Sequence, residues 1–175
     1  SGGYWVSAQA TEIVAQPSTI TGSIGIYGGK IVIGEALDRF ASVQTDRVQV
    51  GSALADASSP YRRFNPEERR ALVDFIDRGY ATFLARVAEG RELTPTQTEE
   101  IAQGRVWTGA QAKERRLVDH LGGYTTALAR ARALAQLAPE EPVQIRRFPA
   151  PQSPFEELRQ LFGVLLLSAC GRRIY

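Results

Sequence analysis

The chain has 175 residues, enough for one domain with a sizeable core, and 43% of them are hydrophobic and 23% charged, an ordinary globular balance. A net charge of +2 with scattered basic residues argues against nucleic-acid binding, and one Cys and one His exclude an internal disulfide, a Cys-based zinc site and a His-rich metal site. The absence of Met predicts a piece of a longer chain, and no apolar run reaches the ~18–20 residues of a membrane span.

The first third of the chain predicts short elements joined by turns. Residues 18–29 are rich in Gly, Thr and Ile, which indicates a strand-and-turn region where backbones approach closely. In chain order we expect a helix over 2–10, a buried strand over 12–16, the strand-and-turn region, a helix over 33–43, a strand over 43–50 and a loop over 51–63.

The remaining elements are mostly helical. Asn65 followed by Pro66 and two acids is typical of a helix start, and this helix should run to about Glu89 and stop at Gly90. Its core-facing side chains are predicted to be Leu72, Phe75, Ile76, Phe83 and Val87. Further helices are expected over 95–102, 108–116 and 125–137, then a strand over 143–148, a linker over 149–154 and a terminal helix over 155–167. Strands alternating with helices indicate the α/β class.

Ser1 is the first candidate for chemistry. Because it precedes a predicted helix, backbone N–H groups and the positive end of the helix dipole lie beside it, and Gly2 and Gly3 leave room for a peptide to approach. Such an arrangement suits a nucleophile whose oxyanion is held by the following N–H. By spacing alone, however, an ordinary helix N-cap followed by a flexible Gly pair is the favoured interpretation, because a lone Ser-Gly-Gly is common.

A nucleophilic serine needs a base, and the chain offers few. His120 follows Asp119 directly, and neighbours in sequence normally point apart, so a surface histidine at a helix end is the better interpretation. A desolvated lysine is the conventional alternative, and only Lys30 and Lys113 are present. A free α-amine at Ser1 is a third option, as in N-terminal-nucleophile hydrolases.

Two longer segments then resemble a known family. SGGYWVSAQATEIVAQPSTITGSIGIYGG at the start and GRVWTGAQAKERRLVDHLGGYTTAL from Gly104 onward are similar to the two signatures of the signal peptide peptidase A (protease IV) family of serine peptidases. The resemblance covers residues 1–148 and implies part of a Clp protease/crotonase-like domain. The linker over 149–154 and the C-terminal helix and tail over 155–175 lie outside it and rest on composition alone. The resemblance also implies a Ser–Lys dyad that cleaves remnant signal peptides and other hydrophobic peptides, with no cofactor or metal.

The resemblance assigns roles to three residues. Ser1 falls on the nucleophile, the Gly2 N–H on part of the oxyanion hole, and Ser23 on the hydroxyl that orients the catalytic lysine. Short members carry that lysine in a loop where this sequence has Ala55. Long members have two similar domains, and the N-terminal one supplies the lysine. The chain therefore resembles the C-terminal catalytic domain of a long member, with Lys30 and Lys113 outside the dyad.

The resemblance also sets expectations for partners and place. They are an N-terminal domain of the same protein, a tetramer-like homo-oligomeric ring, a membrane anchor outside these residues, and a bacterial inner membrane with the catalytic domain in the periplasm. Apolar groove residues are expected near Ile20 and Ile24. Two rival hypotheses stay open: an inactive scaffold half that binds peptides, and crotonase-type acyl-CoA chemistry, which the first segment disfavours.

Overall fold

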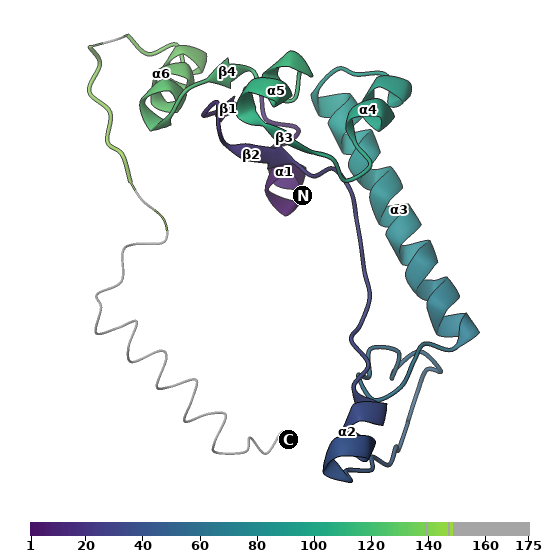
Figure 1. The fold of residues 1–175 in the computed structure, drawn as a ribbon. Helices are drawn as coiled ribbons and strands as arrows, with labels where there is room; N and C mark the ends of the chain where they lie inside the picture. The colour runs from purple at the N-terminus through teal and green to yellow at the C-terminus, as the bar shows by residue number, and fades with distance from the viewer. Residues whose placement is uncertain (139, 147, 149–175) are drawn as a thin grey trace, which may run out of the picture. The chain divides into compact units, whose positions relative to one another are not determined.

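The computed structural model describes residues 1–138, 140–146 and 148. Residues 1–136 form one compact unit, and the chain from Leu137 onward belongs to a second. Helices joined by short strands make up the first unit, as Figure 1 shows. The expectation of a mixed helix and strand domain is confirmed at this coarse level. The predicted terminal helix over 155–167 and the linker lie outside the described residues.

The N-terminal elements match their predictions but are shorter. Helix α1 covers Gly2–Ser7, strand β1 covers Val14–Ala15, strand β2 covers Ile20–Gly22 and helix α2 covers Gly34–Ala41. Ser42, with a φ of 51°, follows α2 in the left-handed conformation, a common way for a helix to end.

The next two helices begin at the predicted capping residues. Helix α3 covers Pro66–Gly90, and the side-chain oxygen of Asn65 accepts a hydrogen bond from the Glu68 N–H at 2.9 Å. The Glu68 carboxylate in turn accepts from the Asn65 N–H at 2.9 Å, which completes a capping box. Helix α4 covers Pro95–Ile101 and begins with the same reciprocal pair, here Thr94 and Gln97. Each cap is worth about 1 kcal/mol, so local chemistry fixes both helix starts.

The last elements of this unit pair back onto the first ones. They are strand β3 over Val106–Thr108, helix α5 over Gly109–Glu114, strand β4 over His120–Leu121 and helix α6 over Tyr124–Leu134. Strand β1 runs parallel to β4, and β2 runs antiparallel to β3 with Gly22 opposite Val106. These pairings bring the N-terminal residues beside the segment from 104 to 121.

The core includes the contacts of α3 with α1 and α4 and extends to buried residues of β1 and α5. The Trp5 and Phe83 rings are 4.6 Å apart, and a Cβ at Gly90 would collide with the carbonyl oxygen of Ala8, so only glycine permits this approach of α1 to α3. Among the described residues, the buried hydrophobic set is Tyr4, Ala8, Ala15, Ile24, Phe83, Val87, Ala102, Ala112, Leu117 and Val118. Two of the five side chains predicted to face the core are thus buried, whereas Phe75 is 65% exposed and that prediction is wrong.

Two predicted strands are absent. Residues 43–50 have no regular structure, and Val48 and Val50 are 94% and 87% exposed. The described part of 143–148 likewise contains no strand. A strand needs a neighbour to complete its hydrogen bonds, and among the described residues neither segment has one, so residue preference alone does not produce a strand.

Candidate active site

Ser1 occupies the N-cap position of α1 without capping it. The Trp5 N–H donates to the Ser1 carbonyl at 2.8 Å, but the Ser1 side chain accepts no hydrogen bond from the helix. A Cβ built on Gly2 or Gly3 would meet no heavy atom within 4 Å, so the first turn is open to an approaching molecule. The N-cap interpretation is therefore correct for the backbone, while the exposed hydroxyl stays available for other chemistry.

Ser23 lies in a tight turn directly after β2. Gly22 has a φ of 79° and Ser23 a φ of 50°, so both adopt the left-handed conformation, which a non-glycine residue rarely takes. The Ser23 N–H donates to the carbonyl of Arg105 at 2.9 Å. Within the described part of the chain its hydroxyl has no hydrogen-bond partner. The backbone of Ser23 is therefore fixed while its functional group is free.

One cavity of about 610 Å³ joins the two serines. Its wall contains Ser1, Ser23, Gly25, Ile26, Tyr27, Ile76, Asp77, Tyr80, Glu99, Gln103 and Gly104. A second cavity of about 390 Å³ also contains Ser1, together with Gly2, Trp5 and Phe83. The structure thus brings together all three residues predicted for the site, with Ser1 common to both cavities.

The apolar part of the wall differs from the prediction. Ile24 is fully buried in the core and Ile20 is 78% exposed, and neither lines these cavities. Strand β2 ends at Gly22, and the left-handed turn at Ser23 interrupts the alternation of side chains along the strand. Ile26 and Tyr27, which follow this turn, form the apolar wall instead.

Sequence reasoning also missed the polar residues that α3 and α4 supply, namely Asp77, Tyr80, Glu99 and Gln103. A signal for Tyr80 was present, because it lies four residues after Ile76 and three before Phe83, on the stripe already predicted for α3. For Glu99 and Gln103 no such signal exists, since their place depends on how α4 packs against α3.

Neither lysine lines either cavity. The Lys30 ammonium donates to the carbonyl of Ala57 at 2.8 Å and lies 4.2 Å from the centre of the Phe64 ring. Lys113 is exposed and donates to the carbonyl of Asp119 at 2.8 Å. Both side chains are engaged with loops rather than with Ser1.

Asp119 and His120 point apart, as their adjacency predicted. The Asp119 carboxylate accepts from Arg91 at 2.5 Å and from the Ile13 N–H at 2.7 Å. His120 lies 3.2 Å from the Glu12 carboxylate, whose pKa is held below its usual range chiefly by a hydrogen bond from Arg130. His120 belongs to β4 and is half-buried, so its predicted place at a surface helix end is wrong. Neither residue lines the cavities of Ser1.

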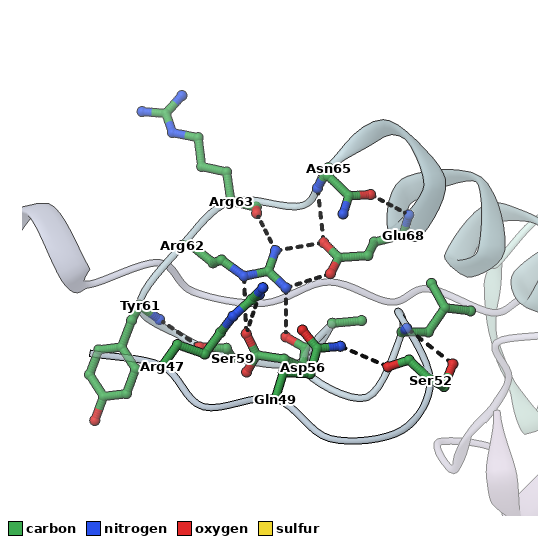
Figure 2. A network of polar contacts seen from close by, with 12 residues as sticks. Arg47, Gln49, Ser52, Asp56, Ser59, Tyr61, Arg62, Arg63, Asn65 and Glu68 are labelled. Atoms are coloured by element: carbon green, nitrogen blue, oxygen red, sulfur yellow. Dashed lines mark hydrogen bonds and ion pairs between the residues drawn. The ribbon is translucent and has the colours of Figure 1, made fainter. Parts of the chain in front are cut away.

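The loop that contains Ala55 is held by charges. The Arg62 guanidinium donates to both oxygens of the buried Glu68 carboxylate, at 2.8 and 2.5 Å, and to Asp56 at 3.0 Å (Figure 2). Hydrogen bonds from Arg62 and from the Asn65 N–H lower the Glu68 pKa from an ordinary 4.5 to about 2. Ala55 itself offers no proton acceptor for Ser1, because its side chain is a methyl group.

Comparison with known proteins assigns the chain to a family. The model of peptidase family S49 matches residues 1–138. The chain belongs to peptidase family S49. It is 45% identical over 137 residues to Protease 4 of Salmonella typhi, an alignment that covers 78% of this chain and 22% of that relative. It is 34% identical over 148 residues to Protease 4 of Haemophilus influenzae, covering 82% and 23% of the two chains.

A third S49 relative comes from a plant. The chain is 28% identical over 163 residues to the Arabidopsis thaliana protein named serine protease SPPA, chloroplastic, covering 93% of this chain and 24% of the relative. The chain therefore spans less than a quarter of the length of these three relatives. In the described part of this S49 chain, no helix is both long and apolar enough to cross a membrane.

Proposed function

We propose that the protein containing this chain is a serine endopeptidase with Ser1 as nucleophile. The observation that carries the proposal is the shared cavity: Ser1 and Ser23 come from different elements, and both line it. Neither serine hydroxyl makes a hydrogen bond within the described residues. Membership in peptidase family S49 supports the same chemistry.

The reaction proceeds by acyl transfer. The Ser1 oxygen attacks the scissile carbonyl carbon while a neutral lysine takes the hydroxyl proton, and the Gly2 N–H donates to the developing oxyanion. When the tetrahedral intermediate collapses, the C–N bond breaks and the lysine returns the proton to the leaving amine. Water then attacks the Ser1 ester by the same route in reverse, which releases the peptide acid and restores the serine.

The lysine comes from outside these 175 residues, in the N-terminal domain of the same protein. Lys30 and Lys113 are engaged elsewhere, and Ala55 stands where short members of the family carry the base. Ser23 lines the shared cavity, and its free hydroxyl is suited to accept from or donate to such an amine. A hydrogen bond of this kind would fix the orientation of the lysine, and a dry site would keep it neutral.

The substrates we propose are remnant signal peptides and other hydrophobic peptides. Ile26, Tyr27 and Ile76 give the wall of the shared cavity an apolar side for such side chains. The same proposal includes a partial Clp protease/crotonase-like fold, a homo-oligomeric ring and a bacterial inner-membrane location with the catalytic domain in the periplasm. An anchor outside these residues would hold the protein at the membrane.

Peptidase assays on two forms of the protein test this account. The complete gene product should cleave an apolar peptide, and the 175-residue chain alone should not, because the base is missing. Lys30→Ala and Lys113→Ala in the complete protein should keep activity within about twofold, since neither lysine lines the cavities of Ser1.

Three results would contradict parts of the account. Turnover by the isolated chain that is lost in Ser1→Ala but kept in both lysine variants would favour the α-amine as base. A large loss in Lys30→Ala or Lys113→Ala would place the base within this chain. No turnover by the complete protein would favour the inactive scaffold. Among the described residues, the walls of both cavities contain no lysine, which is also compatible with that hypothesis.

A further inference from the structure

A two-residue turn between α4 and β3 lies against the turn of Ser23. Gln103 and Gly104 have φ values of 54° and 73°, and the Arg105 N–H donates to the carbonyl of Ala102 at 3.0 Å. Two successive left-handed residues closed by this hydrogen bond have the features of a type I′ turn. The 103–104 turn therefore has a defined backbone conformation, which can fix the conformation of the adjacent Ser23 turn.

This turn holds Ser23 from both sides. The carbonyl of Arg105 accepts from the Ser23 N–H at 2.9 Å, and the Gly104 N–H donates to the carbonyl of Ile24 at 2.9 Å. A Cβ at Gly25 would lie 2.7 Å from the Gly104 Cα, so the two backbones touch with no side chain between them. The left-handed conformation of Ser23 costs about 1–2 kcal/mol for a non-glycine residue, and it persists because these contacts impose it.

Tyr80 of α3 holds the 103–104 turn through hydrogen bonds of its hydroxyl. Its hydroxyl accepts from the Gln103 N–H at 3.1 Å and donates to the Glu99 carboxylate at 3.1 Å. Glu99 also accepts from the Gln103 side-chain amide at 3.3 Å. Burial, more than any other cause, raises the pKa of Tyr80, so the hydroxyl keeps its proton and remains a donor. Tyr80 thereby links the long helix α3 to the 103–104 turn, and this turn contacts the Ser23 segment through backbone atoms.

We propose that Tyr80 is a positioning residue for Ser23, acting through Gln103 and Gly104 with Glu99 as its anchor. The inference rests on the proposed function, in which Ser23 orients the lysine. Tyr80 touches no reacting atom in this account. It sets the direction of the Ser23 hydroxyl by holding the turn that holds Ser23, and it lines the same cavity as both serines.

Kinetics of Tyr80→Phe in the complete protein test the coupling. The ring remains, and both hydroxyl hydrogen bonds are lost. We expect kcat to fall about tenfold with KM within about twofold, because the loss is of orientation in the reacting complex. The pH profile of kcat/KM should shift in the same direction as in Ser23→Ala. The double variant should be no slower than Ser23→Ala alone, since residues acting through one another are non-additive.

Thr98→Val is the matched control in the same region. The Thr98 hydroxyl is buried and donates to the carbonyl of Thr94 at 3.0 Å, so the control loses a buried hydroxyl hydrogen bond in α4 without touching the 103–104 turn. Its kcat and pH profile should remain those of the parent. Additive losses in the Tyr80→Phe, Ser23→Ala double variant, or an equal kcat loss in Thr98→Val, would overturn the positioning role.

Amide hydrogen exchange separates this inference from the peptidase proposal. In Tyr80→Phe the Ser23 and Gly104 amides should exchange at least about fivefold faster than in the parent, and in Thr98→Val they should not, because only the first variant releases the turn. Unchanged exchange at both amides overturns the inference even if the protein is an active peptidase. Faster exchange in a protein with no peptidase activity would show that Tyr80 holds the Ser23 turn. The same result would reject the proposed peptidase function, and with it the role of this turn in catalysis.

Discussion

The two serine hydroxyls beside the cavity and the charged side chains of the loop around Arg62 differ in how many hydrogen-bond partners they have. In the loop, Arg62 donates to Glu68 and Asp56, and Glu68 also caps α3, so each charge has several partners (Figure 2). At the cavity, neither serine hydroxyl has a hydrogen-bond partner within the described residues. Saturated polar groups stabilise a fold, whereas unsatisfied ones beside a cavity are available to a substrate.

The turn of Ser23 also differs from the segment that precedes the Arg62 loop in how its backbone is held. The turn of Ser23 is fixed on both sides by hydrogen bonds to residues 104–105. Residues 43–50, which lead toward the Arg62 loop, have no regular structure and expose Val48 and Val50. At Ser23 the candidate site thus combines a fixed backbone with a free hydroxyl, a combination suited to preorganised chemistry.

Replacing Ser1 gives the largest expected effect and separates chemistry from stability. In the complete protein, Ser1→Ala should lower kcat/KM at least about a thousandfold, because the nucleophile is lost. The free energy of unfolding should change by less than about 0.5 kcal/mol, since the side chain makes no capping hydrogen bond. Peptidase assays and urea unfolding measure the two quantities.

Ser7→Ala is the control at the other end of α1. The Ser7 hydroxyl donates to the Gly3 carbonyl at 2.8 Å on the exposed side of the helix, so its loss should leave activity unchanged. Retained activity in Ser1→Ala would remove the nucleophile assignment. A stability loss of about 1 kcal/mol without an activity loss would restore the simple N-cap interpretation.

Ser23 is expected to give the next largest effect. Ser23→Ala and Ser23→Gly both remove the hydroxyl and should lower kcat about 100-fold, which is the lower end of general acid–base contributions. Because Ser23 has a φ of 50°, the glycine variant should be about 1 kcal/mol more stable than the alanine variant. If the glycine variant recovered activity along with stability, backbone strain and not the hydroxyl would be the functional feature.

Glu68 should affect stability at acid pH and leave the chemistry alone. Its pKa falls from an ordinary 4.5 in the unfolded chain to about 2 in the fold, so its contribution is present above about 4.5 and lost as pH falls toward 2. Glu68→Gln should lower stability at neutral pH and flatten the dependence between these values. Urea unfolding at a series of pH values measures this.

Glu67→Gln provides the matched control on the same helix turn. Glu67 is exposed and makes no ion pair within the described residues, so the parent's pH dependence should persist in this variant. Peptidase activity at a temperature well below unfolding should be the same in both glutamine variants. If Glu68→Gln kept the parent's loss of stability between about pH 4.5 and 2, Glu68 would not be its source. If Glu68→Gln but not Glu67→Gln lost peptidase activity, the Arg62 loop would not be separate from the chemistry.

Features encoded in consecutive residues could be predicted from the sequence. Asn65 and Thr94 start α3 and α4 because their side chains satisfy N–H groups three residues away. The opposite directions of Asp119 and His120 also follow from local geometry. The strand expected over 43–50 failed, and β3 over Val106–Thr108 was missed, because both outcomes depend on whether a distant segment supplies hydrogen bonds.

The candidate site divides in the same way. Ser1, Gly2 and Ser23 were identified through a family resemblance, and their shared neighbourhood is what the fold adds. Tyr80 was not among the residues predicted to face the core, and its hydrogen bond to Gln103 arises only when α4 packs on α3. Long-range packing, which no short window of sequence contains, therefore decides which polar residues surround the serines.

Covalent trapping of Ser1 tests the central claim most directly. The complete protein would be treated with a serine-acylating peptidase inhibitor and digested, and mass spectrometry would locate the adduct. The account predicts an ester on Ser1 that hydroxylamine removes and that is absent in Ser1→Ala, with loss of activity in proportion to labelling. Full inhibition with the adduct on another residue, or an amide adduct resistant to hydroxylamine, would contradict it.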